Sequence, residues 1–284
     1  MTSRISSLPI THRSFVNTWE CDENRHMNVQ FYFRAFQQAS EVLALSATGN
    51  NPAARTAIVR HVRYHRELVE GRPIVVRSGH VAEGKFAGSI LHLLEDGESG
   101  MLAATALDQP GYKVGRMEIA PEEDWTNALP RGIQPGPLGP EDIEAMLESG
   151  RAITSHAAIL RNFETGPDGD LLANAIISRF TDGAPHVWTH AGIATKWLSE
   201  TNQGRVAVEM KLTRLARSSE GRALSLVSWI GDMGEKTFSI RHQLQDMMSG
   251  EAIASGEVRC LVMDLTTRRA VPVPHFARDA FNKY

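Results

Sequence analysis

The sequence of 284 residues has only two cysteines, Cys21 and Cys260. They are too few and too far apart for a disulfide framework or a C-x-x-C pair, so we expect a protein of the reducing cytoplasm. No run approaches the roughly 18 consecutive apolar residues of a membrane span, and the first nine residues lack the apolar segment of a signal peptide. These absences argue against a membrane partner and a secreted protein.

An excess of charge of either sign is also absent. The chain carries 30 Lys and Arg against 33 Asp and Glu, for a formal net charge of −3. Without a basic excess, nucleic acid is not expected as a partner. Neither nucleotide-binding glycine loop occurs, nor does G-x-S-x-G, and His186 and His190 lack the spacing and third ligand of a metal site. No cofactor and no metal are therefore expected.

The most informative feature of the sequence is an internal repeat. Residues 70–104 and 220–254 align without gaps, and 13 of the 35 pairs are identical. Average composition gives roughly two identities by chance, so the repeat indicates a tandem duplication. Further upstream an offset of 160 aligns Asp22 with Asp182 and His26 with His186.

A linker separates the two halves. Seven of the eleven residues in 130–140 are Pro or Gly, which is typical of a stiff segment without its own core. We predict a first unit over residues 1–129, a linker with a short helix over 130–150, and a second, degenerate unit over 151–284.

Each half is predicted to contain one long helix and a series of short strands. In the first half, 14–21 is expected as a strand, 29–45 as a buried helix with Asn28 as its N-cap, and three or four strands should follow. These strands are expected at about 57–65, 73–82, 86–94 and 101–107. In the second half we expect a strand near 174–181, a helix near 189–200, and strands from 205 to about 262.

This pattern predicts an α+β fold. Short turns between consecutive strands favour an antiparallel meander, and one apolar helix can cover one face of a curled sheet. Two units can also pair their sheets edge to edge, which would protect two exposed edges.

The densest polar cluster lies between the first strand and the helix. It contains Asp22, Asn24, His26 and Asn28. An Asp can act as a general base on water or as a nucleophile on an acyl carbon. The helix start offers unpaired N–H groups, here those near Met27 and Asn28, which could polarise a carbonyl oxygen. The same residue types also occur at helix starts for capping alone.

The cluster resembles the loop of the hotdog-fold acyl thioesterases. In their acyl-ACP branch the loop reads Asp-x-Asn-x-His-(Val/Met)-Asn-x-x-x-Tyr, and every named position is present here, ending at Tyr32. The stretch 64–71 also resembles the family's Tyr and Gly-Asp region, with Arg72 where Asp is usual. The resemblance covers about 14–108 well and 174–265 weakly.

The resemblance implies a double hotdog fold and hydrolysis of an acyl-CoA or acyl-ACP thioester without a cofactor. Asp22 would be the base or nucleophile, Asn24 and His26 would orient water or the thioester, and the N–H groups near Met27 and Asn28 would polarise its carbonyl. A homodimer of such chains is a further expectation from the family.

The aligned second copy, with Asp182 and His186, has Ala184 for Asn24 and Trp188 for Asn28. Because two of the four polar groups are missing, a scaffold role for this copy is favoured over a second active site.

Two other functions stay open on the sequence alone. A hotdog enoyl-CoA hydratase or dehydratase would resemble Asp-x-Asn-Pro-x-His, with Asp and His five apart, whereas Asp22 and His26 are four apart without an intervening Pro. An acyl-CoA-binding protein without activity is the other alternative.

Overall fold

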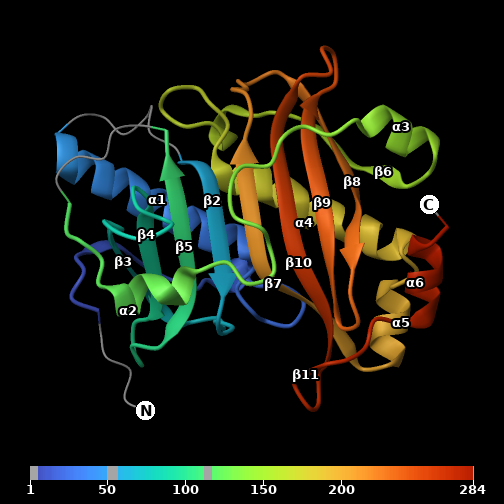
Figure 1. Ribbon diagram of the computed structural model, residues 1–284, viewed down its shortest axis with the longest axis horizontal. Helices are drawn as coiled ribbons and strands as arrows, with labels where there is room; N and C mark the ends of the chain where they lie inside the picture. The colour runs from blue at the N-terminus through green and yellow to red at the C-terminus, as the bar shows by residue number, and fades with distance from the viewer. Residues whose placement is uncertain (1–5, 50–56, 112–116, 284) are drawn as a thin grey trace. The chain divides into compact units, whose positions relative to one another are not determined.

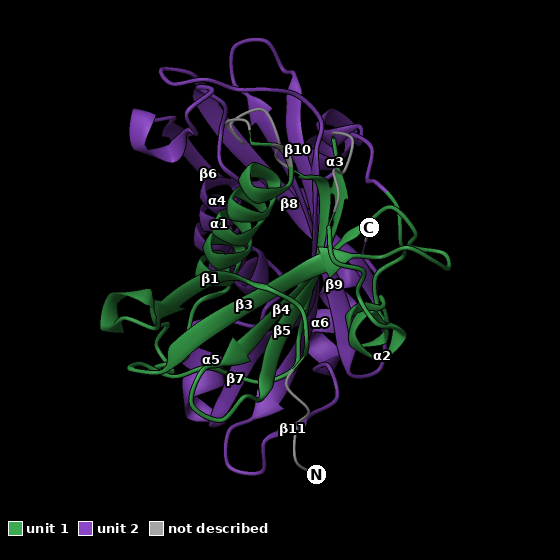
Figure 2. Cartoon of the chain, turned by 90° about the vertical axis from the view of Figure 1, so that its left-hand side faces the viewer, with its two compact units in different colours: residues 1–136 green, residues 137–284 purple. Residues whose placement is uncertain are grey.

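A computed structural model describes residues 6–49, 57–111 and 117–283 of the chain. The chain divides into two compact units, residues 1–136 and 137–284, drawn in two colours in Figure 2. The division falls within the segment predicted as the linker. Within the described residues, no helix is long and apolar enough to cross a membrane.

Unit 1 consists of a long helix packed on an antiparallel sheet. Its elements are β1 (Ile10–Phe15), η1 (Thr18–Glu20), α1 (Val29–Thr48), β2 (Ala57–Tyr64), β3 (Pro73–His80), β4 (Ile90–Asp96), β5 (Leu102–Pro110), α2 (Glu122–Trp125) and η3 (Thr126–Ala128). The strands lie in the order β1-β3-β4-β5-β2, and α1 packs mainly against β1, β3 and β4 (Figure 1). The segment that carries α2 and η3 packs on apolar side chains of the sheet through Ala120, Trp125 and Ala128.

The predicted helix and the four strands after it are confirmed, but the predicted strand over 14–21 is wrong. The strand β1 ends at Phe15, and Thr18–Glu20 forms a short 3-10 helix instead. The Asn17 N–H donates to Glu20 Oε2 and the Glu20 N–H donates to the Asn17 carbonyl, so a local capping box bends the chain.

Unit 2 repeats the plan of unit 1. Its elements are α3 (Ile143–Glu148), β6 (Ala152–Ile159), η4 (Asn162–Glu164), α4 (Ala173–His190), α5 (Thr195–Glu200), β7 (Gln203–Arg214), β8 (Ala223–Met233), β9 (Thr237–Asp246), β10 (Ala252–Asp264), β11 (Arg269–Ala270) and α6 (His275–Phe281). The strand order β7-β10-β9-β8-β6 matches that of unit 1 element by element, with β11 added beside β10. The duplication inferred from the sequence is therefore a duplication of fold.

The prediction for the start of the second half is wrong. Residues 174–181, expected as a strand, lie inside α4, and the expected helix over 189–200 contains only the end of α4 and α5. Gly183 and Pro185 disfavour a helix on propensity, yet both lie within α4. A Cβ on Gly183 would come within 2.7 Å of Leu226 Cδ2 and Ser155 Oγ, so close packing of the helix on the sheet explains the glycine.

The segment after the unit boundary lies along unit 2. The Leu138 N–H donates to Thr213 Oγ1 at 2.9 Å, and the Glu141 N–H donates to Gln243 Oε1 at 2.8 Å. In α3, Ile143 is buried against Val227 and Trp229.

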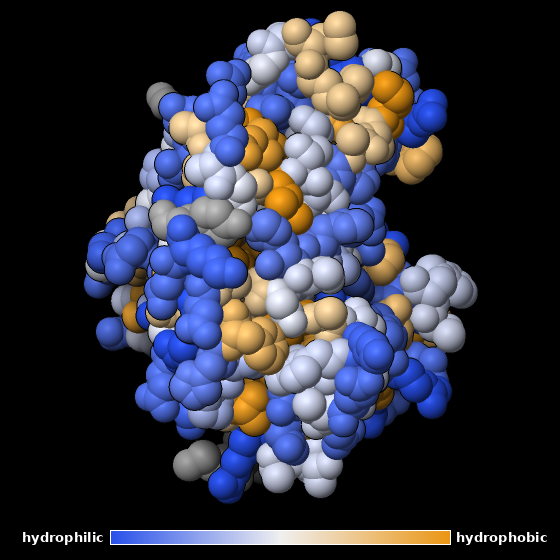
Figure 3. Space-filling view, turned by 90° about the vertical axis from the view of Figure 1, so that its right-hand side faces the viewer, coloured by the Kyte–Doolittle hydropathy of each residue, from blue (hydrophilic) through white to orange (hydrophobic). Residues whose placement is uncertain are grey.

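On the face drawn in Figure 3, hydrophilic residues predominate and hydrophobic ones lie scattered among them.

A buried polar network joins α1 to the sheet of unit 1. Arg60 and Asp108 are direct partners across β2 and β5, each 2% exposed, and their side chains form a bidentate pair at 2.6 and 2.7 Å. From α1, the Ser40 hydroxyl donates to Asp108 Oδ2 at 2.9 Å and accepts from Arg60 at 2.8 Å. His92 lies 3.2 Å from Asp108 through Nε2 and 2.6 Å from Ser78 Oγ through Nδ1. The charges are buried but hydrogen-bonded, as their burial requires.

Removing the Asp108 charge should destabilise unit 1. Asp108→Asn leaves the Arg60 guanidinium buried without its counter-charge, and we expect a loss of about 3–5 kcal/mol in the free energy of unfolding. Urea denaturation monitored by circular dichroism measures it. Glu98→Gln is the matched control, because the exposed Glu98–Arg72 pair should contribute no more than about 1 kcal/mol.

The Asp108 contribution should also depend on pH. Burial alone would raise the pKa of the Asp108 carboxyl, but the charge and hydrogen bonds of Arg60 outweigh burial and lower that pKa. Because the folded pKa lies below the unfolded value of about 3.9, this contribution is present above that pH and is lost as the pH falls. Equal stability of the wild type and Asp108→Asn at neutral pH would contradict the role of the pair.

Candidate active site

The loop over 22–28 is a tight turn held by the carboxylate of Asp22. Asp22 Oδ1 accepts hydrogen bonds from the backbone N–H groups of Asn24, at 2.9 Å, and His26, at 3.0 Å. Arg25, at the tip of the turn, has a φ of 63°. Asp22 Oδ2 accepts no hydrogen bond from the described residues, and the side chain is half-buried. Oδ1 of Asp22 therefore holds the loop, and Oδ2 takes no part in holding it.

Asn28 is the N-cap of α1, as predicted. Its Oδ1 accepts from the Gln30 N–H at 3.1 Å, which satisfies one unpaired donor of the first turn. The loop is closed by the Cys21–Met27 bridge. Beneath it, the buried carboxylate of Glu20 pairs with Arg34 of α1. These contacts fix where α1 begins relative to Asp22.

Glu67 is a neighbour of the loop that the sequence analysis missed. His26 Nε2 lies 3.4 Å from Glu67 Oε2, and the backbone of His26 is bridged to Val69. Glu67 lies within the stretch 64–71 that resembles the thioesterase family, so that resemblance could have drawn attention to it. His26 and Glu67 are 41 positions apart in the chain, so no local pattern indicates their contact.

Two of the N–H groups near the start of α1 donate to carbonyl groups of the protein itself. The Met27 N–H donates to the Leu68 carbonyl at 2.7 Å, and the Asn28 N–H donates to the Glu20 carbonyl at 2.8 Å. Of the N–H groups near Met27 and Asn28, these two are therefore occupied within the protein. The next donor along the chain is the N–H of Val29, the first residue of α1, for which no described residue provides an acceptor.

The tyrosine of the motif lies at the inner side of the loop. Tyr32 is 3% exposed and its hydroxyl forms a hydrogen bond with the Leu68 backbone. Burial, supported by the nearby Asp22 charge, raises the pKa of Tyr32 well above its usual value. The ring of Tyr64 meets that of Tyr32 edge-on, with centroids 5.2 Å apart.

Cys21 is not activated as a nucleophile. Burial and the neighbouring carboxylates of Asp22 and Glu20 raise the pKa of its thiol. Burial raises the pKa of Cys260 to about 12. In the described parts of the chain, no group of three or more His, Cys, Asp or Glu side chains could hold a metal ion.

Comparisons with known proteins identify the family and the fold of the chain. The sequence model of the thioesterase-like superfamily matches residues 16–114 and 168–281, which is most of the chain. The chain belongs to the thioesterase-like superfamily. A search of curated protein sequences finds no significant match.

Solved structures of thioesterases share the fold of this superfamily member. A protein classed as an oleoyl thioesterase from Lactobacillus plantarum has a TM-score of 0.60 and 11% identity, covering 94% of this chain and 98% of that one. A 12:0-ACP thioesterase from Umbellularia californica has a TM-score of 0.57 and 12% identity, covering 88% and 92%. An acyl-ACP thioesterase from Bacteroides thetaiotaomicron has a TM-score of 0.55 and 10% identity, covering 88% and 96%. The predicted α+β class, with two tandem hotdog units, is confirmed.

The second copy of the loop is not where the sequence alignment placed it. Asp182 and His186 lie inside α4 rather than before it. The Thr165–Leu171 bridge repeats the Cys21–Met27 bridge at an offset of 144, so Gly166 takes the place of Asp22 and Leu172 that of Asn28. The second unit of this thioesterase-like chain therefore lacks the carboxylate of the first.

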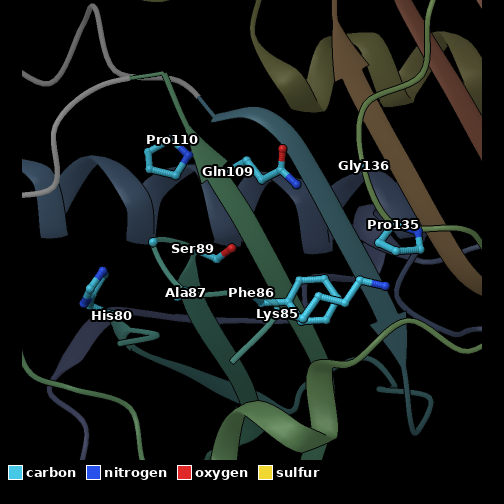
Figure 4. Close-up of a pocket in the computed structure, with 10 residues that line it drawn as sticks. His80, Lys85, Phe86, Ala87, Ser89, Gln109, Pro110, Pro135 and Gly136 are labelled. Carbon is cyan, nitrogen blue, oxygen red and sulfur yellow. The ribbon is translucent and has the colours of Figure 1, made fainter. Parts of the chain in front are cut away.

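Two cavities of unit 1 differ in their relation to the loop. A cavity of about 290 Å³ is lined partly by Glu67, Leu68 and Val69, the segment that contacts the loop. A larger one, of about 660 Å³, is lined by His80, Lys85, Phe86, Ala87, Gly88, Ser89, Gln109, Pro110, Pro135 and Gly136 (Figure 4). None of the predicted site residues lines either of these two cavities, but Glu67, which contacts His26, lines the smaller one.

The cap of α1 can be tested apart from any chemistry. Asn28→Ala removes the acceptor for the Gln30 N–H, and we expect a loss of about 0.5–2 kcal/mol in stability, measured by urea denaturation. Asn28→Ser retains a capping oxygen and should recover most of the loss. If both variants were as stable as the wild type, Asn28 would not cap α1 in solution.

Proposed function

We propose that this superfamily member hydrolyses an acyl-CoA or acyl-ACP thioester to a free acid and a thiol, at the loop over 22–28. The observation that carries the proposal is the carboxylate of Asp22, held through one oxygen while the other is available, at the start of a buried helix. Family membership and the thioesterase fold support it.

Asp22 can serve in either of two ways. As a general base, it takes a proton from water while the water oxygen bonds to the acyl carbon and the C–S bond breaks. As a nucleophile, Asp22 Oδ2 bonds to the acyl carbon and expels the thiolate, and water then hydrolyses the resulting anhydride. In both routes the thiolate leaves as a thiol after taking a proton, and no cofactor is needed.

The other loop residues assist Asp22. His26, beside the Glu67 carboxylate, can orient water or move a proton, as carboxylate-paired histidines do. Asn24, half-buried at the turn, can orient the water or the thioester. Asn28 contributes by fixing the start of α1.

The N–H of Val29 is the proposed donor to the thioester carbonyl oxygen. It lies at the first position of α1, where the N–H groups have no partner within the helix and the positive end of the helix dipole favours negative charge. A single such donor to an oxyanion typically contributes a factor of about 10²–10³ in kcat.

The substrate is proposed by its reacting group, the thioester, and not by its carrier. Acyl-ACP thioesterases and a protein solved in complex with CoA are among the structures similar to this chain. A homodimer remains a prediction from the family.

Replacing Asp22 should abolish hydrolysis while keeping the loop. In Asp22→Asn the amide oxygen can still accept from Asn24 and His26, but it cannot act as a base or nucleophile. We expect release of free thiol from a panel of acyl-CoAs and acyl-ACPs to fall by at least about 10³-fold. Asp182→Asn is the matched control, because Asp182 is exposed on α4, and its activity should equal that of the wild type.

The same assay separates the alternatives. Thiol release that survives in Asp22→Asn would remove Asp22 from the chemistry. Loss of the conjugated absorbance of an enoyl-CoA, without thiol release, would make the chain a hydratase. Binding of acyl-CoA without turnover of any substrate would leave the chain a binding protein.

Val29→Pro tests the carbonyl donor directly. Proline is favoured at the first helical position, and Asn28, with a φ of −65° and a ψ of 144°, already has the extended conformation that precedes proline. The variant removes one N–H but keeps the helix intact. We therefore expect kcat to fall about 10²–10³-fold with an unchanged circular dichroism spectrum. Val29→Ala keeps the N–H and should retain activity; equal activity in both variants would exclude this donor.

A further inference from the structure

The hydroxyl of Tyr64 stands out among the buried polar groups of unit 1. It is inaccessible to solvent, and within the described residues of unit 1 it is the one buried side-chain nitrogen or oxygen with no hydrogen-bond partner. Buried hydroxyls in native structures are nearly always hydrogen-bonded, since leaving one unpaired costs free energy. An isosteric phenylalanine would avoid that cost.

The unpaired hydroxyl of Tyr64 contrasts with the hydrogen-bonded polar side chain beside it on β2. Tyr64 ends β2 on the same face as Arg60, which donates to Asp108, to Ser40 and to carbonyl groups of α1. The other buried polar side chain on this face of β2, that of Arg60, therefore has its partners. Burial raises the pKa of the Tyr64 hydroxyl far above its ordinary value, so the group keeps its proton and is a donor.

Tyr64 lies next to the candidate site. Its ring meets Tyr32 edge-on at 5.2 Å and 81°, and the Tyr32 hydroxyl contacts the backbone of Leu68. The Leu68 carbonyl in turn holds the Met27 N–H of the loop. A series of three contacts therefore joins the ring of Tyr64 to the loop that carries Asp22.

We infer that the Tyr64 hydroxyl donates a hydrogen bond to an oxygen of the bound acyl group and thereby positions the thioester. The inference rests on the proposed thioesterase function. A buried donor that is left unpaired in the free protein is satisfied by the ligand, and a ligand without the matching oxygen is disfavoured.

The accepting oxygen has two possible sources. It is either the carbonyl oxygen of the thioester, present in every substrate, or an oxygen substituent on the acyl chain, such as a hydroxyl or keto group near the carbonyl. The first source makes Tyr64 a positioning group for all substrates. The second makes it a determinant of specificity for oxygenated acyl groups.

The experiment compares the wild type and Tyr64→Phe on octanoyl-CoA and 3-hydroxyoctanoyl-CoA, with kcat and KM measured separately by thiol release. Loss of kcat by the same factor of about three- to tenfold on both substrates identifies the thioester carbonyl. A loss of that size in kcat/KM confined to the hydroxylated substrate identifies the acyl substituent. A purely structural tyrosine would change neither quantity.

Tyr32→Phe and thermal unfolding provide the controls. Tyr64→Phe removes an unpaired hydroxyl and should have a Tm equal to or above that of the wild type, whereas Tyr32→Phe loses the contact with Leu68 and should have a lower Tm. If both kinetic constants of Tyr64→Phe stay within twofold of the wild type on both substrates, the inference is overturned and the thioesterase proposal stands. Absence of thiol release by the wild type from every acyl-CoA and acyl-ACP would overturn the proposed function itself.

Discussion

The pair of Arg60 and Asp108 is the interaction on which unit 1 depends. Two opposite charges are removed from water between a helix and a sheet, and that is tolerable only because each is hydrogen-bonded on several sides. Their partners come from α1, β2, β4 and β5, so the pair fixes the helix against three strands. The position of the N-terminal end of α1, and with it the loop that carries Asp22, depends on this anchor.

The second unit has the same fold but lacks a charged pair at the corresponding positions. The chain from Thr11 through Ser78 to His92 is repeated by Ser155, Ser228 and His242. Met210 and Val258, which are direct partners across β7 and β10, replace the charged pair. Gly256 admits the ring of Phe180, which stacks on His242 at 4.6 Å, and burial lowers the pKa of that histidine to about 3. The unit with Gly166 in place of Asp22 has an apolar pair where the other has a charged one.

The candidate site illustrates how backbone hydrogen bonds limit what a motif can do. From the sequence, any N–H near the start of α1 could face a ligand. In the folded chain, the carbonyl groups of Leu68 and Glu20 occupy the N–H groups of Met27 and Asn28, which leaves that of Val29 as the proposed donor. In the turn, Oδ1 of Asp22 accepts the hydrogen bonds that hold the loop, and Oδ2 is the oxygen proposed to react.

The duplication, a helix over 29–45, the strands after it and the loop motif could be predicted from the sequence, because these depend on local periodicity, on turns and on residue identity. The folded structure established the span of α4, where packing of Gly183 against β6 and β8 outweighs helix propensity. It likewise decided the contact of His26 with Glu67 and the unpaired hydroxyl of Tyr64. Such contacts join residues distant in the chain, and their geometry is set by how the sheet and the helix pack, which no local pattern encodes.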